Sequence, residues 1–172
     1  MARADDIAQV LRECIDDLKL TIDSLEPVST DLLLLLATLR YRLGPRLEAA
    51  GISLTWEVGD IPPLPWLGAQ SALHILRILQ EVLTNVLKHS RATAVRVQTS
   101  RDDHWARVRV HDNGTPFDLT ALPLEHGGRG LANVQRRAAA LNAAVSWEPD
   151  ATGTWFTLCL PVAPVASSLD AG

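Results

Sequence analysis

Cysteine is scarce in this chain: its 172 residues include only Cys14 and Cys159. The two cysteines lie far apart and form no C-x-x-C pair, so the sequence indicates neither a zinc site nor a disulfide framework. We expect both to be buried free thiols in a reducing compartment.

Long apolar runs are missing as well. The longest, Leu32–Ala37, is far shorter than the roughly 20 residues that a membrane-spanning helix needs. Arg3, Asp5 and Asp6 stand where a signal peptide would have its apolar segment. We therefore expect a cytoplasmic protein, or the cytosolic part of a longer membrane-bound one.

An excess of positive charge is also absent. Sixteen Lys and Arg residues stand against 20 Asp and Glu residues, which gives a formal net charge of −4. A mildly acidic chain is poorly suited to nucleic acid or an anionic membrane, so we expect no nucleic-acid partner. Because Lys19 and Lys88 are the only lysines, a lysine inside a motif stands out.

The composition that remains is that of a globular protein, 47% hydrophobic and 21% charged. Length and composition predict one domain, or one domain with an appendage. Apolar periodicity predicts helices over 5–25, 31–49, 67–89 and 129–141, and strands over 52–58, 94–99, 105–111, 143–148 and 154–160. The leucine run at 32–36 is apolar nearly all round, so its helix should be covered on both sides.

The order of these elements predicts an α+β fold. We expect a two-layer sandwich of a mixed, mostly antiparallel sheet with helices on one face, preceded by N-terminal helices. The stretch 112–128 is rich in turn residues and reads as a long loop, which in a compact domain is usually functional.

A first polar cluster lies on the predicted helix 67–89. Glu81, Asn85, Lys88 and His89 are spaced 4, 3 and 1 apart, so they would share one face of an α-helix. An amide oxygen suits Mg²⁺, a carboxylate can act as a base, and an ammonium can neutralise phosphate. The alternative interpretation is a solvated helix face with an i,i+4 pair.

Two further motifs lie at predicted turns. His111-Asp112-Asn113-Gly114 follows a strand, where a carboxylate can accept from an exocyclic amino group, although an ordinary Asn-Gly turn fits equally. The segment 127–133 is glycine-rich and opens a helix, a place suited to phosphate or to a flexible connection. The pair Gly153-Thr154 is too short to carry a conclusion alone.

Taken together, these motifs resemble the ATP-binding domain shared by histidine kinases, DNA gyrase and their relatives, the Bergerat fold. Glu81 to Asn85 resembles the family's N box, Asp112 to Gly114 its first glycine box, Gly128 to Leu131 its second, and Gly153-Thr154 its terminal Gly-Thr. The stretches 85–93 and 130–137 are similar to sensor kinases of the nitrate-sensor and lipid-fluidity-sensor type. The resemblance spans about residues 50 to 161.

The resemblance implies ATP and Mg²⁺ as ligands and a role for each matching residue on the phosphate side. Asn85 would ligate the Mg²⁺ that bridges the phosphates, and Glu81 would assist catalysis nearby. Lys88 and His89 would approach the phosphates. Gly128, Gly130 and Leu131 would belong to the segment that wraps them.

On the base side, Asp112 would accept from the adenine amino group and Gly114 would let the base lie close. Thr154 would support the adenine. The loop between Phe117 and Gly127 would be a lid over the nucleotide. One departure is Pro116, which stands where the family usually has a second glycine.

A second departure is the missing phosphoacceptor, because none of the five histidines lies in the predicted N-terminal helices. Residues 1–48 therefore resemble only the second helix of a dimerisation hairpin plus a linker helix. They would precede a kinase domain at 50–161 and a flexible tail at 162–172. The apolar stripe from Ile7 to Leu25 is either a homodimer seam or packed on its own domain.

The resemblance implies the ATP-binding catalytic domain of a two-component sensor histidine kinase. It would transfer the γ-phosphoryl group to a histidine outside this chain, on the dimerisation helix of the parent kinase, and would serve a response regulator indirectly. Two alternatives are a serine kinase of the anti-sigma type and a degenerate module that binds partners without nucleotide. Pro116 favours the second alternative.

Overall fold

The computed structural model describes residues 7, 11, 14–15, 31–116 and 128–163. Most of the predicted helix 5–25, the predicted lid between Phe117 and Gly127, and nearly all of the predicted tail lie outside these residues. The elements in chain order are α2 (Leu32–Ala49), β1 (Ser53–Glu57), α3 (Ala69–Asn85), η1 (Val86–Ser90), β2 (Ala94–Arg101), β3 (Trp105–Asp112), α4 (Gly128–Ala140), β4 (Ala144–Asp150) and β5 (Gly153–Pro161).

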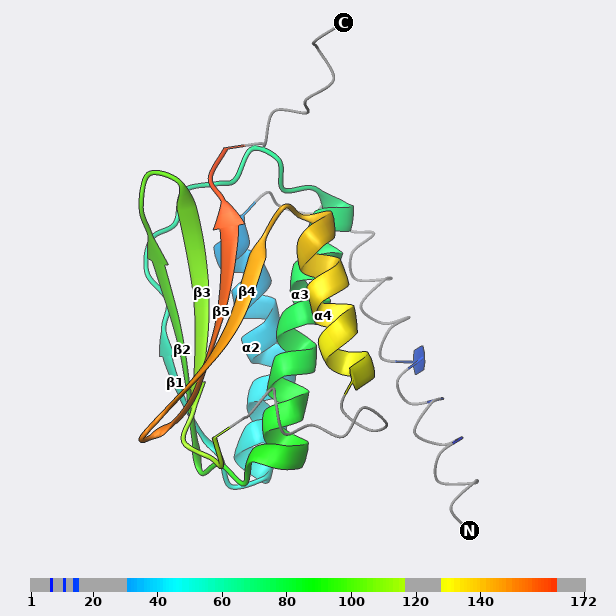
Figure 1. Cartoon of the computed structure of the whole chain (residues 1–172), viewed down its shortest axis with the longest axis vertical. Coiled ribbons are helices and arrows are strands. Elements are labelled where there is room, and N and C mark those ends of the chain that lie inside the picture. Colours follow the sequence, from blue (N-terminus) through cyan, green and yellow to red (C-terminus); the bar gives the residue numbers. More distant parts are fainter. Residues whose placement is uncertain (1–6, 8–10, 12–13, 16–30, 117–127, 164–172) are drawn as a thin grey trace, which may run out of the picture.

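The five strands form one sheet in the order β1-β2-β3-β5-β4. β1 pairs parallel with β2, and the other three pairings are antiparallel. Helices α2, α3 and α4 lie together on one face of this sheet (Figure 1). The predicted fold class, an α+β sandwich with a mixed and mostly antiparallel sheet, is confirmed.

Alternation along the central strands builds the core. Val108 and Val110 on β3 and Leu158 on β5 are almost completely buried, whereas their neighbours Arg107 and Arg109 are only half-buried. Since successive strand residues point to opposite faces, the buried set faces the helices and the arginines face away from them. Each large aliphatic side chain buried in this way stabilises the fold by roughly 1.5–3 kcal/mol.

Helix α2 belongs to this same core. The Asp31 carboxylate accepts from the Leu33 N–H at 2.8 Å and begins the helix, and Gly51, with φ of 77°, follows its end. Its buried side chains are Leu32, Leu35, Leu36, Leu39, Leu43 and Leu47. The core of the described residues therefore includes α2 as well as the predicted kinase domain at 50–161.

Two expectations about burial are wrong. Helix α2 is not covered on both sides, because Leu34 is 54% exposed and Tyr41 is 84% exposed. The cysteines are not both buried either, since Cys14 is exposed and Cys159 is half-buried on β5. In the part of the chain that is described, no helix is long and apolar enough to cross a membrane.

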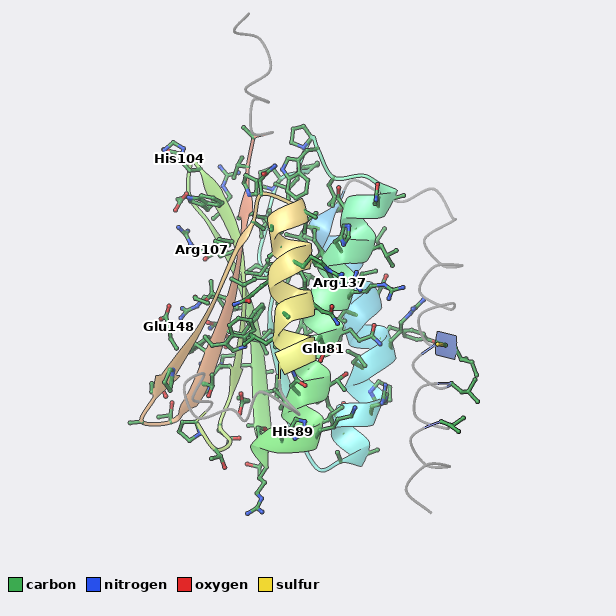
Figure 2. The ribbon with its side chains drawn as sticks, turned by 45° about the vertical axis from the view of Figure 1, so that its right-hand side comes forward. Glu81, His89, His104, Arg107, Arg137 and Glu148 are labelled. Atoms are coloured by element: carbon green, nitrogen blue, oxygen red, sulfur yellow. The ribbon has the colours of Figure 1, made fainter. Side chains whose placement is uncertain are left out.

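The turn between β2 and β3 is held by one carboxylate, that of Asp102. Asp102 Oδ1 accepts from the backbone N–H groups of His104 (2.9 Å) and Trp105 (2.8 Å), and Asp102 Oδ2 accepts from Arg107 at 2.6 Å. In Figure 2, His104 lies at the upper end of the sheet and Arg107 lies on the side of the sheet that faces away from the helices. The His104 N–H and the Arg107 guanidinium lower the pKa of Asp102 from 3.8 to about 2.

We predict that the hairpin loses stability in acid between these two values. Because the pKa of Asp102 is lowered on folding, its ionised form stabilises the fold fully above about 3.8 and loses that effect as the pH falls towards about 2. Asp102→Asn, which keeps Oδ1 but not the charge, should remove this part of the pH dependence. Unfolding of both proteins in denaturant from pH 2 to 5 measures the difference; parallel curves would contradict the prediction.

Candidate functional site

The predicted site residues gather at one end of the sandwich. The C-terminal end of α3, the end of β3, the start of α4 and the start of β5 all lie at the lower end of the molecule in Figure 1. Three glycines show how closely these segments approach. A Cβ at Gly114, Gly130 or Gly153 would collide with Ser90, Glu81 or Asp112, respectively.

The helix that carries the first polar cluster changes its winding there. It is α-helical only over Ala69–Asn85 and continues as one π-helical turn over Val86–Ser90, whereas the sequence predicted an α-helix to residue 89. A π turn adds a residue to the hydrogen-bonded ring and is frequent at functional sites. Lys88 and His89 therefore do not continue the α-helical face that Glu81 and Asn85 share.

Glu81 lies against the first turn of α4. Its carboxylate occupies the space that a side chain at Gly130 would need, and it lies beside the lower end of α4 in Figure 2. The start of a helix presents unpaired N–H groups and a partial positive charge, which suits a carboxylate. Glu81 is half-buried, while Asn85, Lys88 and His89 are exposed at the end of the same helix.

α4 begins one residue earlier than predicted, at Gly128, and Leu131 in its first turn is half-buried. The structure thus brings Gly130 close to Glu81, whose carboxylate fills the space beside this glycine.

Asp112 and Thr154 are buried side by side. Asp112 ends β3, Thr154 is the second residue of β5, and the two are directly paired across the strands. Only 8% of Asp112 and 3% of Thr154 is exposed. Gly153, with φ of 149°, lets β5 begin against the Asp112 carbonyl, where any Cβ would collide.

The surroundings of Asp112 act on its charge in opposite directions. Burial raises its pKa above 3.8, while the hydrogen bond from the Gly114 N–H (3.0 Å) and the neighbouring Ser90 hydroxyl lower it. The raising effect is the larger. Asp112 is thus a desolvated acceptor that the Gly114 N–H holds in place.

Gly114 serves a contact that the resemblance did not imply. A Cβ at this position would collide with the Ser90 carbonyl, and the next N–H, of Thr115, donates to that carbonyl at 2.7 Å. The close approach that glycine allows here is between two turns of the protein. The predicted approach of the base to Gly114 stays a prediction.

Ser90 and Asn113 are the site residues that sequence reasoning missed. Both stand inside the quoted motifs, but neither received a role of its own. Ser90 is buried, with 9% exposed, although it follows two exposed polar residues, so no local pattern predicted its burial. For Asn113 the sequence indicates only a place in the first glycine box or in an ordinary Asn-Gly turn.

The side-chain oxygens at this end of the molecule fit a Mg²⁺ ion whose other ligands are phosphates and waters. Mg²⁺ commonly takes one or two protein oxygens and completes its shell with waters and substrate phosphates. The exposed amide of Asn85, one turn after the Glu81 carboxylate, matches that demand. Among the described residues no three His, Cys, Asp or Glu side chains group as a metal site, so a site made of protein ligands alone does not fit them.

Comparison with known proteins points to one family. The family of histidine kinase-, DNA gyrase B- and HSP90-like ATPases matches residues 70–164. An uncharacterized sensor-like histidine kinase of Chloroflexus aurantiacus is 26% identical over 94% of this chain and 28% of its own length. The nitrate/nitrite sensor protein NarX of Escherichia coli is 32% identical over 50% of this chain and 16% of its own.

The fold has solved counterparts too. The full-length structure of ShkA in complex with AMPPNP has a TM-score of 0.66 at 24% identity and covers 99% of this chain and 41% of that one. The chain spans less than a third of the length of the two curated relatives described above.

We predict that alanine has different effects at two glycines of the site. Gly114→Ala places a methyl group against backbone, which cannot move away, and should cost about 1–3 kcal/mol of unfolding free energy. Gly130→Ala meets only the end of the flexible Glu81 side chain, and alanine favours the helix, so stability should change by less than about 1 kcal/mol. Denaturant unfolding of both variants measures this; equal losses would contradict it.

We also predict that Asp112 titrates above the ordinary value of 3.8. Because its pKa is raised on folding, ionisation of Asp112 disfavours the fold, and this cost appears as the pH rises through the folded-state pKa. Relative to the parent, Asp112→Asn should therefore gain stability as the pH rises from about 3.8. The carboxyl carbon NMR shift gives the midpoint; one at or below 3.8 would contradict the assignment.

Proposed function

The chain belongs to the family of histidine kinase-, DNA gyrase B- and HSP90-like ATPases, and we propose that it is the ATP-binding catalytic domain of a sensor histidine kinase. The reaction would be Mg²⁺-dependent transfer of the γ-phosphoryl group of ATP to a histidine outside this chain. One observation carries this proposal. The buried pair Asp112 and Thr154 lies at the same end of the fold as the polar end of the helix formed by α3 and η1.

The buried pair would recognise the base. Asp112 would accept from the adenine amino group, and Thr154, paired with it across the strands, would support the same edge of the ring. A site built to hydrogen-bond such a group discriminates strongly, because its buried acceptor is left unpaired by the wrong ligand. The burial of Asp112 supports this role.

The helix end would hold the phosphates. Asn85 with the phosphates would hold Mg²⁺, which when bound supplies neutralisation of the phosphate charge. Lys88 and His89, on the π turn, would approach the phosphates, and the α4 start with Gly128, Gly130 and Leu131 would line them. Such reactions depend mainly on positioning and charge stabilisation.

Glu81 would act on the attacking histidine. It lies against the α4 start, which fixes its carboxylate near the end of the helix that carries Asn85. From there it could take up the proton that the imidazole loses as it attacks the phosphoryl group.

The N-terminal segment would connect this domain to its substrate. Ile7, Leu11 and Ile15 are 60%, 57% and 49% exposed, so these three side chains are not packed on their own domain. Their exposure supports a seam with another helix, such as the histidine-bearing dimerisation helix of the parent kinase or a second copy. The response regulator would then receive the phosphoryl group from that histidine in the cytosol.

The test is a calorimetric titration of the protein with Mg·ATP. We predict that the parent binds Mg·ATP and that Asn85→Asp shows no metal-dependent binding. A carboxylate at this position repels the phosphates and alters the metal ligand. Gln70→Glu is the matched control, since it makes the same amide-to-acid change at an exposed position in the first turn of α3, at the opposite end of this helix from Asn85. It should bind as the parent does.

Two outcomes would overturn parts of the proposal. A parent that showed no binding at millimolar Mg·ATP would leave the degenerate-module alternative. An Asn85→Asp variant that bound Mg·ATP as tightly as the parent would refute the metal assignment. Phosphotransfer to an isolated histidine-bearing hairpin, compared with a serine-bearing partner protein, separates the histidine kinase from the serine kinase alternative.

A further inference from the structure

Two turns that are distant in sequence are fastened together beside Asp112. One turn is residues 90–94, which follows η1, and the other is residues 113–115, which follows β3. We call their contact the clasp. Of the residues in the two turns only Ala92 belongs to the apolar core, and Asn113 at the centre of the clasp is exposed.

Asn113 supplies most of the clasp. Its side-chain oxygen accepts from the backbone N–H groups of Thr93 and Ala94, both at 2.9 Å, and its side-chain N–H group donates to Thr93 Oγ1 at 3.0 Å. Its own backbone N–H donates to the Ala94 carbonyl at 3.2 Å. One side chain thus uses its donor and its acceptor on a turn that lies about 20 residues away in sequence.

Ser90 closes the clasp from the other side. Its carbonyl accepts from the Thr115 N–H at 2.7 Å, and its hydroxyl accepts from the Ala92 N–H at 3.1 Å. The same hydroxyl donates to the Val86 carbonyl at 2.9 Å, and its proximity to Asp112 lowers the pKa of that carboxyl group. Gly114 makes this approach geometrically feasible, since a Cβ there would collide with Ser90.

The clasp lies between the two halves of the proposed site. The base half contains Asp112, and the phosphate half contains Lys88 and His89. The turn 90–94 continues directly from η1, which carries Lys88 and His89, and Asn113 follows Asp112 directly. The only other route between these halves along the chain is the whole β2–β3 hairpin. The clasp therefore fixes the distance between Asp112 and the phosphate-side residues more directly than the sheet does.

We propose that Asn113 is a positioning residue that sets the spacing between the base half and the phosphate half of the nucleotide site. This inference rests on the proposed function. It predicts a particular pattern: a ligand that spans both halves depends on Asn113, whereas a ligand that occupies only the base half does not.

The experiment compares Mg·ADP with adenosine on Asn113→Ala. Calorimetry with Mg·ADP should show about tenfold weaker binding, the lower end of what the loss of three side-chain hydrogen bonds that hold a site can cost. Adenosine, followed by amide NMR shifts that register weak binding, should lose less than about twofold, which is smaller than the loss of one net hydrogen bond.

Two further variants separate positioning from general damage. Asn113→Asp keeps an oxygen acceptor for Thr93 and Ala94 and should restore most of the Mg·ADP affinity. Gln98→Ala is the control, because it removes another side-chain amide that hydrogen-bonds, to Glu57, far from the site. It should leave both affinities unchanged.

Hydrogen exchange tests the clasp without any nucleotide. In Asn113→Ala the amides of Thr93 and Ala94 should exchange faster, while those of the central strands stay protected. Unchanged exchange at both amides would overturn the clasp itself.

The remaining outcomes distinguish the two proposals. If the parent binds Mg·ADP and Asn113→Ala binds it equally well, the inference is wrong and the proposed function stands. Equal losses for adenosine and Mg·ADP would also overturn it, since Asn113 would then act on the base half alone. If the parent binds no Mg·ADP, the proposed function is wrong and the inference fails with it.

Discussion

Burial of one face of the sheet against three helices is the interaction on which the rest of this structure depends. The inner residues of β3 and β5 and the leucines of α2 share one core, so the helices cannot move without exposing apolar surface. That packing fixes the axes of α3 and α4 against the sheet. The ends of these helices, together with the ends of β3 and β5, then form one polar edge whose geometry is inherited from the core.

Close backbone approach turns this edge into a site. Gly114, Gly130 and Gly153 each stand where a methyl group would meet a neighbouring segment, and the three neighbours are different elements. The role of these glycines is therefore close packing and not only backbone flexibility. They let turns and helix starts touch at distances that a side chain forbids, which brings the carboxylates, amide and backbone N–H groups of the proposed site to one end of the fold.

Two carboxylates illustrate how burial decides the role of an acidic residue. Asp102 is exposed, accepts from two backbone N–H groups and an arginine, and has its pKa lowered to about 2. Asp112 also accepts from a backbone N–H group, yet its burial raises its pKa. The first is a structural acceptor at a turn, and the second is a desolvated acceptor next to the proposed base site, where an unpaired acceptor favours a ligand that donates.

Between residues 31 and 161 the sequence by itself determined most of the elements, the fold class and the order of the motifs, because periodic burial and turn residues are local properties that each segment carries. Only the tertiary structure decided what depends on neighbours. The strand order with β5 between β3 and β4, the π turn after Asn85, the exposure of Leu34 and Tyr41, and the clasp at Asn113 are of this kind. Alternation tells which side chains face a core, but not which strand, helix or turn lies opposite them, since that follows from packing the whole chain at once.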